Sequence, residues 1–415
     1  MNTPPPPVVA SEQQNQLKLQ SQLKIQSVSS YVVRVPRNFA QAIGGAGSPS
    51  ILQSGERRYR RAKSYSTVYS QEIECLLVQV KAGGYVGWGE AQAPVAPEIC
   101  HAIIEHLVGP LLVGEPAPAP AATYSRLYDG MRVRGHSGGF YLDALAAIDI
   151  ALWDLLGKVT GKPLAELLGG PLRTSIPLYV SGLLGDDLDS QINYALEKVE
   201  HGATAFKVYW PDCFDQGLKL IERLRAKLPQ IDIYVDALWR MDRHQAARYA
   251  EALAALRVGW LEAPLMPEDI AGHAWLCDVS KTPIAIGESY RSTWDFERLA
   301  DERAADILQP DLGRCGITTT RFITELCAGR SLGFAPHVSI SLGLQLAAAI
   351  HVAAVAPTLV RVESNPGILA VAQKFSDISA KDEFSLFEVP DRPGLGVDIS
   401  EKALQPYVTA STTIA

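Results

Sequence analysis

Four short apolar runs in the middle of the chain each carry a charged residue at or near their end: Ala205-Phe-Lys-Val-Tyr209, Ile233-Tyr-Val-Asp236, Trp260-Leu-Glu262 and Pro283-Ile-Ala-Ile286, the last followed by Glu288. Similar runs lie on both sides, at residues 177–180, 306–309, 333–335 and 359–363. Helical windows separate these eight runs, which predicts alternating β and α units, a parallel sheet and right-handed crossovers. Eight such units favour a closed α/β barrel.

Polar residues recur at the ends of these predicted strands with a nearly constant period. The intervals are 29, 26, 26, 23, 26 and 26 residues along the series Lys207, Asp236, Glu262, Glu288, Asp311, His337 and Glu363. The active site of an α/β barrel lies at the carboxyl ends of its strands. One charged residue at a strand end is an ordinary solvated loop start, but the common period predicts that all seven converge on one mouth.

Three acids of this series, Asp236, Glu262 and Glu288, are candidate metal ligands. Crowded carboxylates repel one another unless a cation neutralises them. All-oxygen ligation favours a hard ion, and Mg²⁺ fits best because it keeps positions open for water or substrate oxygens. We expect one Mg²⁺ per subunit, with Mn²⁺ as a substitute. Three separate surface salt bridges are the alternative interpretation.

Two further pairs are candidate acid/base groups. Asp311 and His337 lie one βα unit apart, so the carboxylate can orient the imidazole and raise its basicity. Lys207 and Tyr209 lie two apart on one strand, and period-2 geometry points both side chains into the mouth. A buried structural histidine and a barrel-filling aromatic are the alternatives for His337 and Tyr209.

Together these residues are suited to removing a proton α to a carboxylate. That proton is weakly acidic, so the enolate must be stabilised as it forms. The metal and Lys207 can hold the two developing negative oxygens, and a protonated Glu363 can donate a hydrogen bond. A base on one face and an acid on the other complete the reaction.

The chain resembles the mandelate racemase branch of the enolase superfamily over roughly residues 24–405. The resemblance rests on the order and spacing of Gly87-Trp-Gly-Glu90, Ala147-Ile-Asp-Ile-Ala-Leu-Trp-Asp154, Leu167-Leu-Gly-Gly170, Ala205-Phe-Lys207, Asp236-Ala237, Leu261-Glu-Ala-Pro264, Ile286-Gly-Glu-Ser289, Gln309-Pro-Asp311 and Pro336-His337. It implies a modified (β/α)₇β barrel, a type of TIM barrel, over residues 146–369. It also implies an α+β capping domain from residues 23–145 and 370–410. The same resemblance implies Mg²⁺ on the three acids, a His337–Asp311 dyad and an electrophilic Glu363.

Two positions depart from the family pattern. The family often has Lys-x-Lys on the second strand, where this chain has Tyr209, and an Asn where it has Leu238. The second Lys is a base in racemases of the branch, and an unperturbed Tyr titrates near 10 unless Lys207 and the metal lower its pKa. We therefore expect a dehydratase, which needs one competent base and an acid for the β-hydroxyl. Family members with Tyr here look like acid-sugar dehydratases that yield 2-keto-3-deoxy acids.

The loop at residues 38–61 and the end of the cap are expected to complete the pocket. Arg57, Arg58 and Arg61 belong to a basic run that can grip the distal carboxylate of an aldarate, unless it is a solvated or interface run. Arg134 and His136 are further candidates. Gly44, Gly45 and Gly47 favour a mobile loop, because the strand–turn–helix context of a phosphate cradle is missing.

Composition excludes several other classes. The 415 residues carry a net charge of −7 and no window of 18 consecutive apolar residues, which argues against nucleic acid as a partner and against a membrane span. Residues 1–22, with Pro4–Pro7 and a Gln-rich stretch, are expected to form a disordered tail without a secretory signal. The six scattered cysteines fit a reducing cytoplasm. A small-molecule sugar acid is the expected substrate, and a homo-oligomer the expected assembly. A racemase, epimerase or lactone cycloisomerase, and a catalytically silent metal-binding protein, are the alternatives.

Overall fold

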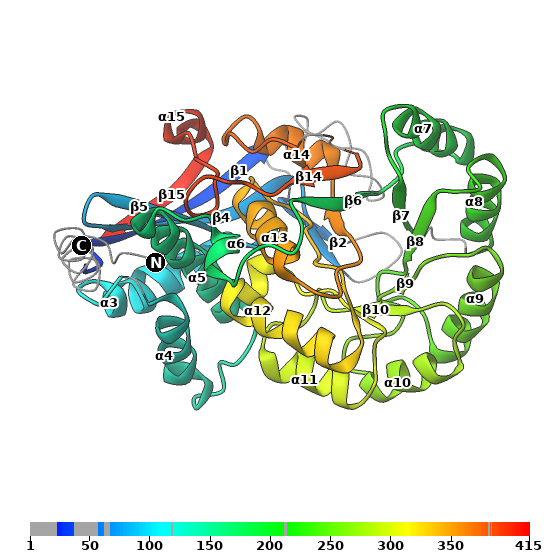
Figure 1. Ribbon diagram of the computed structural model, residues 1–415, viewed down its shortest axis with the longest axis horizontal. Helices are drawn as coiled ribbons and strands as arrows, with labels where there is room; N and C mark the ends of the chain where they lie inside the picture. The colour runs from blue at the N-terminus through cyan, green and yellow to red at the C-terminus, as the bar shows by residue number, and fades with distance from the viewer. Residues whose placement is uncertain are drawn as a thin grey trace, which may run out of the picture.

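The computed structural model describes residues 23–36, 57–61, 67–117, 119–210, 214–380, 382 and 384–415. The predicted tail at 1–22 and most of the predicted loop at 38–61, including its glycines, lie outside these residues. Figure 1 shows a barrel of strands and helices beside a smaller sheet with its own helices. This is the predicted arrangement of a modified TIM barrel and an α+β cap.

The barrel consists of eight parallel strands in the order β12-β11-β10-β9-β8-β7-β6-β13. The strands are β6 (Ser175–Ser181), β7 (Ala205–Tyr209), β8 (Asp232–Asp236), β9 (Leu261–Glu262), β10 (Ile284–Ile286), β11 (Ile307–Leu308), β12 (Gly333–Phe334) and β13 (Val362–Ser364). A parallel bridge between Phe334 and Leu359 joins the two ends of this order, so the barrel is closed. The prediction of eight βα-type strands is confirmed.

Seven helices connect these strands in sequence and surround them. They are α7 (Leu188–Glu200), α8 (Phe214–Lys227), α9 (Arg243–Ala255), α10 (Ile270–Val279), α11 (Thr293–Asp301), α12 (Leu312–Arg330) and α13 (Leu344–Val355). Each βα unit therefore returns the chain to the same end of the barrel, which is the physical basis of the period of about 26 residues. Across the described part of the chain, every helix is too short or too polar to cross a bilayer.

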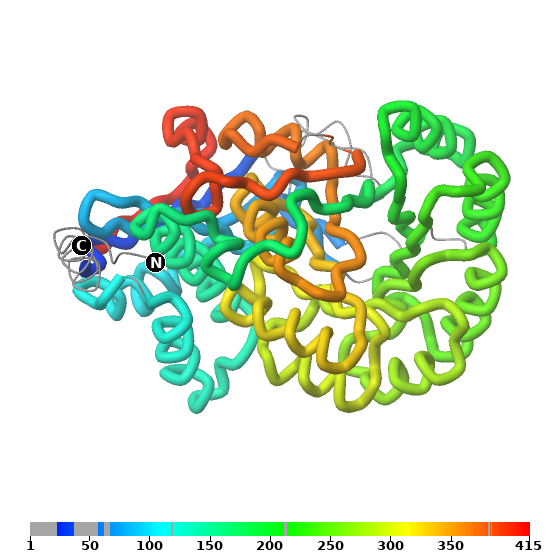
Figure 2. The backbone as a smooth tube through the Cα atoms, viewed as in Figure 1, coloured from blue at the N-terminus to red at the C-terminus, as the bar shows by residue number. Residues whose placement is uncertain are grey.

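The cap is built on an antiparallel sheet in the order β15-β1-β4-β5. Its strands are β1 (Ser27–Pro36), β4 (Glu72–Ala82), β5 (Tyr85–Ala91) and β15 (Val408–Ile414). Gly83 and Gly84 adopt positive φ angles between β4 and β5, as a tight hairpin requires. Figure 2 shows the blue N-terminal and red C-terminal segments running together, where β15 pairs with β1.

Helices cover one face of this sheet. They are α2 (Pro97–Ile103), the π-helix η2 (Ile104–Val108), α3 (Gly109–Leu112) and the long α5 (Gly139–Thr160), and α4 (Pro120–Arg132) packs on α5. The other face packs against the barrel, because Val33, Ile73 and Leu77 belong to the same apolar cluster as the barrel helices. The remaining short elements are α6 (Leu164–Leu167), α14 (Pro366–Ala372), α15 (Glu401–Leu404), η3 (Gln405–Tyr407), the ribbon β2 (Tyr59–Arg61) with β3 (Val68–Ser70), and β14 (Leu386–Glu388).

Two features bear on how the chain divides into domains. Helix α5 spans the expected boundary between residues 145 and 146, and β14 pairs with barrel strand β6 before the chain returns to the cap sheet. The division into 23–145 with 370–410 and 146–369 therefore stays a proposal.

Strand β5 lies unusually close to helix α5. A Cβ atom at Gly87 would come within 2.1 Å of the Ala151 carbonyl oxygen, and one at Gly89 within 1.9 Å of the Ala147 oxygen. Only glycine fits such an approach of two backbones. The Gly-Trp-Gly-Glu segment therefore docks the cap hairpin on α5 and carries Glu90 towards the barrel.

Asp149 on α5 supports a prediction about the pH dependence of stability. Burial raises the pKa of Asp149 to about 6, although the backbone and hydroxyl of Thr318 donate hydrogen bonds to it. A raised pKa means that its contribution to stability is present below the unfolded pKa and is lost as pH rises through 6. Between about pH 5 and pH 7, wild type should lose about 1 kcal/mol relative to Asp149→Asn. Urea unfolding of both proteins at each pH measures this difference, and a constant difference would contradict the assignment.

Candidate active site

The structure brings all seven predicted strand-end residues to one end of the barrel. Asp236 and Glu262 pair in register at the ends of β8 and β9, and Asp311 and His337 form a bridge just beyond β11 and β12. All are buried except Glu288, whose side chain retains 23% of its accessible surface. The burial of Asp236 and Glu262 argues against the alternative of three separate surface salt bridges.

Lys207 lies at the centre of the acidic side chains. Its Nζ atom is 2.7 Å from Glu262 Oε1, 2.9 Å from Glu363 Oε1 and 3.6 Å from Asp236 Oδ2. Burial alone would lower the pKa of Lys207, but Glu262 and Glu363 hold it well above the usual value. Lys207 is therefore a fixed positive charge in a water-poor site.

The carboxylates outnumber the cations around Lys207. Five buried or nearly buried acids lie near one lysine and one imidazole: Asp236, Glu262, Glu288, Asp311 and Glu363. Burial and the neighbouring Glu262 raise the pKa of Asp236 well above its usual value. This is the electrostatic signature of carboxylates that need a further cation.

Hydrogen-bond donors orient two of the candidate metal ligands. Trp260 Nε1 and Gln309 Nε2 donate to Glu262 Oε2 over 3.0 and 2.8 Å, and Trp239 Nε1 donates to Glu288 Oε1 over 2.7 Å. Gln309 stands at a strand end like the predicted residues, a signal that could have identified it, whereas nothing in the sequence marks the Trp239 contact.

The backbone beside two candidate ligands is strained. Leu238 and Ala263 have φ angles of 54° and 45°, in the left-handed region that residues with a Cβ atom rarely adopt. Leu238 N donates to Asp236 Oδ1 over 2.9 Å, so a main-chain bond from this residue orients Asp236. Position 238 is where the family pattern has an Asn. Strain of about 1 kcal/mol or more at each residue is typical of functional sites.

His337 and Asp311 form the predicted dyad. His337 Nδ1 is 2.7 Å from Asp311 Oδ2, and Nε2 is 2.9 Å from Glu288 Oε2 and 3.6 Å from Glu363 Oε2. Since carboxylates only accept, both ring nitrogens carry a proton in this arrangement, and Nε2 faces the mouth. Burial opposes the charged imidazole, but Glu363 and Glu288 raise the pKa of His337 well above its usual value.

Glu363 differs from its prediction. Burial would raise the pKa of Glu363, but Lys207 and His337 lower it below the usual value. Its oxygens accept hydrogen bonds from Ser181 Oγ at 2.5 Å and Val338 N at 2.9 Å. The prediction of a protonated, donating Glu363 is therefore wrong for this arrangement, in which Glu363 is an ionised acceptor.

Tyr209 is held by Ser181. Its hydroxyl is 2.9 Å from Ser181 Oγ, which in turn donates to Glu363. Burial raises the pKa of Tyr209 and outweighs the lowering by Lys207. Lys207 alone therefore does not bring this pKa below its usual value, and Tyr209 is a neutral phenol at physiological pH.

The donor set fits a divalent metal ion. Three carboxylates from successive strands, Asp236, Glu262 and Glu288, supply the oxygen ligands that Mg²⁺ prefers. In the arrangement described, Glu262 and Glu288 direct oxygens to Lys207 and His337, and no three His, Cys, Asp or Glu side chains of the described residues already meet metal-site geometry. Binding a cation would require these carboxylates to rotate about their side-chain bonds.

The predicted substrate-binding arginines are not part of this cluster. Arg57, Arg58 and Arg61 are exposed, and Arg58 pairs with Glu72 over 3.1 Å on the β2–β3 side of the cap. Arg134 and His136 are exposed in the turn after α4. Their assignment to the substrate stays a proposal.

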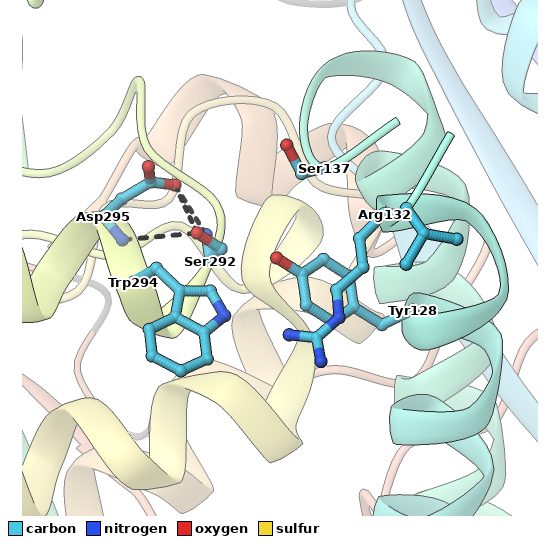
Figure 3. A pocket seen from close by; sticks show the side chains of 7 residues that line it. Tyr128, Arg132, Ser137, Ser292, Trp294 and Asp295 are labelled. Carbon is cyan, nitrogen blue, oxygen red and sulfur yellow. Dashed lines mark hydrogen bonds between the residues drawn. The ribbon is translucent and has the colours of Figure 1, made fainter. Parts of the chain in front are cut away.

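An open surface pocket of about 510 Å³ lies beside that turn. Figure 3 shows Tyr128 and Arg132 from α4 on one side and Ser292, Trp294 and Asp295 from the start of α11 on the other. None of the strand-end residues lines it. It is a junction of cap and barrel, separate from the carboxylate cluster.

Comparisons with known proteins agree with this geometry. Residues 55–169 match the mandelate racemase/muconate lactonizing enzyme N-terminal domain, and residues 192–403 match the enolase C-terminal domain-like family. The D-galactarolactone cycloisomerase of Agrobacterium fabrum is 30% identical over 350 residues, which cover 81% of this chain and 90% of the relative. The L-talarate/galactarate dehydratase of Salmonella typhimurium is 32% identical over 297 residues, or 70% of this chain and 72% of the relative.

The similarity extends to the three-dimensional structure of a solved relative. The L-talarate dehydratase of Polaromonas sp. JS666, complexed with Mg and L-glucarate, superposes with a TM-score of 0.78 at 26% identity. The match covers 94% of this chain and 99% of that one.

Proposed function

Since the chain belongs to the mandelate racemase branch of the enolase superfamily, we propose that it is an Mg²⁺-dependent sugar-acid dehydratase. It removes the proton α to the carboxylate of an aldarate or aldonate, expels the β-hydroxyl as water and yields a 2-keto-3-deoxy acid. Asp236, Glu262 and Glu288 hold the metal. The proposal includes Mn²⁺ as a substitute, a homo-oligomer and a cytoplasmic location.

The observation that carries this proposal is a single competent base. His337 is oriented by Asp311 at 2.7 Å and presents Nε2 to the mouth, where it becomes a base once Glu288 turns away from it towards the metal. Tyr209, by contrast, is a neutral phenol tied to Ser181. Racemisation requires two bases that take the proton from opposite faces. An elimination requires one base and one acid, which this site provides.

The residues divide the work as follows. Bound Mg²⁺ would supply positive charge to the substrate carboxylate as its α-carbon loses the proton. His337 Nε2 takes that proton, and Lys207 keeps a second positive charge at the centre of the site. The same imidazolium can then return its proton to the β-hydroxyl in a syn elimination, or Tyr209 can protonate it from the other side.

A lactone cycloisomerase is the second candidate, because a D-galactarolactone cycloisomerase is 30% identical over most of both chains. The same base can act on the α-proton of a lactone, after which a ring oxygen, not a hydroxide, departs. A catalytically silent metal-binding protein is disfavoured, since the dyad and Lys207 are in place.

A substrate panel tests the proposed function. The purified protein with Mg²⁺ is incubated with mono- and diacid sugars and with their lactones, and keto-acid formation is measured. Turnover of open-chain acids supports a dehydratase, and turnover of lactones alone supports the cycloisomerase. A panel in which acids raise the melting temperature without being consumed would support the silent protein.

Tyr209→Phe separates the two routes for the leaving hydroxyl. If Tyr209 donates the proton to that hydroxyl, the variant should form keto acid about 10²-fold more slowly while still exchanging the α-proton with solvent. This expectation follows because the phenol is neutral and His337 alone removes the α-proton. Exchange in D₂O and keto-acid formation are measured on the same sample. Loss of both activities together would instead make Tyr209 necessary for proton removal.

A further inference from the structure

Asp311 occupies the N-cap position of helix α12, but its side chain makes no capping hydrogen bond. At the equivalent position of their helices, the side chains of Asp187, Asp242 and Ser292 each accept a hydrogen bond from a backbone N–H of the first turn. Asp311 makes no such bond. Its two oxygens are committed elsewhere: Oδ2 to His337 and Oδ1 to Gln345.

Gln345 holds the side of Asp311 that faces away from the imidazole. Its Nε2 donates to Asp311 Oδ1 over 2.9 Å, and both side chains are fully buried. The orientation of the amide is settled chemically, because an ionised carboxylate accepts only from the NH₂ end. Gly313 packs closely against the amide of Gln345, since a Cβ atom at Gly313 would lie 2.6 Å from Gln345 Oε1.

The cap in turn fixes the position of Gln345. Gly343, the residue at the N-cap of helix α13, has no side chain with which to cap it. Glu90 of cap strand β5 takes that role: its carboxylate accepts from Leu342 N at 2.5 Å, Gln345 N at 3.0 Å and Ser341 Oγ at 2.9 Å. A carboxylate at a helix N-terminus is also favoured by the helix dipole.

These contacts form one continuous path from the cap to the dyad. We propose that Gln345 is a positioning residue that fixes Asp311, and through it His337, and that Glu90 makes this position depend on the docking of the cap hairpin onto the barrel. The inference rests on the proposed function for its kinetic readout only. In this view the acid/base group is complete only when cap and barrel are assembled.

Gln345→Met tests the first link. Methionine keeps the length of the side chain but cannot donate, so Asp311 Oδ1 loses its partner. With a substrate from the panel, kcat should fall about 10- to 100-fold with KM nearly unchanged, as for other residues that orient a catalytic group. In protein labelled with ¹⁵N-histidine, the His337 Nδ1–H resonance, identified by its absence from His337→Asn, should shift or broaden. This resonance needs no substrate, so it remains decisive even if the proposed reaction is wrong.

Glu90→Gln tests the second link, with Asp154→Asn as its matched control. Asp154 is also fully buried and also holds strand β5, accepting from Trp88 N and Leu395 N over 2.8 Å each, but it has no bond to α13 or the dyad. We expect Glu90→Gln to perturb the His337 resonance and Asp154→Asn to lower Tm without doing so.

Two outcomes would overturn the proposal. The first is a folded Gln345→Met protein with native kcat and a native His337 resonance. If that variant does not fold, Gln345→Leu, which has no donor and a similar size, gives the same test. The second is a Glu90→Gln protein that, like Asp154→Asn, has a lower Tm but a native His337 resonance. That result would show that the dyad does not depend on the contact of Glu90 with α13.

Discussion

Replacing His337 with Asn lowers kcat by about 10²- to 10⁴-fold, the contribution expected of a positioned general base. Asparagine can keep a contact with Asp311 but has no basic nitrogen, so the α-proton has no acceptor. The fold should survive, because His337 lies at the mouth and packs against polar side chains. We also expect the variant to keep its Mg²⁺ binding. Steady-state kinetics with a substrate from the panel measure the fall in kcat, and Mg²⁺ titration of the variant measures the retained metal binding.

His351→Asn provides the matched control. His351 is also fully buried, but it lies outside the carboxylate cluster. Its Nδ1 accepts a hydrogen bond from Ala165 N, and its Nε2 bonds to the carbonyl oxygen of Leu395. Burial lowers the pKa of His351 to about 4, so it is a neutral structural histidine. We expect this variant to lower Tm and keep kcat. Near-normal turnover by His337→Asn would mean that another group removes the proton.

Mg²⁺ should raise the melting temperature of the wild type, and Asp236→Asn should abolish that rise. Metal at 100 times its dissociation constant adds about 2.7 kcal/mol to the stability of a protein that binds it only when folded. The Asn side chain can still accept from Leu238 N, so the local backbone contact survives. The pKa of Asp236 is raised by burial and Glu262, so removing its charge relieves repulsion. We therefore expect the metal-free variant to melt no lower than the wild type.

Thermal melts with and without Mg²⁺ and isothermal titration calorimetry measure this effect. Asp149→Asn is the control, since Asp149 is a buried acid of α5 that bonds to Thr318 and not to the cluster. It should retain the full response to Mg²⁺. An Asp236→Asn protein that binds Mg²⁺ as tightly as wild type would remove Asp236 from the ligand set.

The barrel and the strand-end residues could be predicted because they follow from one repeated unit. The run 205–209 coincides with β7, and the run 233–236 begins one residue inside β8. Side chains at the ends of parallel strands must share one end of a closed barrel, whatever the intervening helices contain. That is why Lys207 and Glu363, 156 residues apart, could be expected together.

The rest of the site depends on contacts between distant segments, which leave no pattern in the local sequence. Gln345 lies inside an apolar helix, and its bond to Asp311 follows from the packing of α13 on α12. The protonation states of Glu363 and Tyr209 depend on burial and on which donors surround them, so sequence spacing gave the wrong state for Glu363 and left that of Tyr209 open. The pocket loop at 38–56 lies outside the described residues.

Proton NMR in D₂O tests the central claim most directly, because it follows the α-proton itself. The wild-type enzyme with Mg²⁺ is mixed with a sugar acid from the panel, and the α-proton signal is recorded beside the signals of any keto acid. The account predicts that the α-proton signal disappears as 2-keto-3-deoxy acid forms, and that His337→Asn leaves it unchanged. Deuteration at the α-carbon with full recovery of sugar acid and no keto acid would contradict dehydration, and a proton lost equally fast in His337→Asn would contradict the assignment of the base.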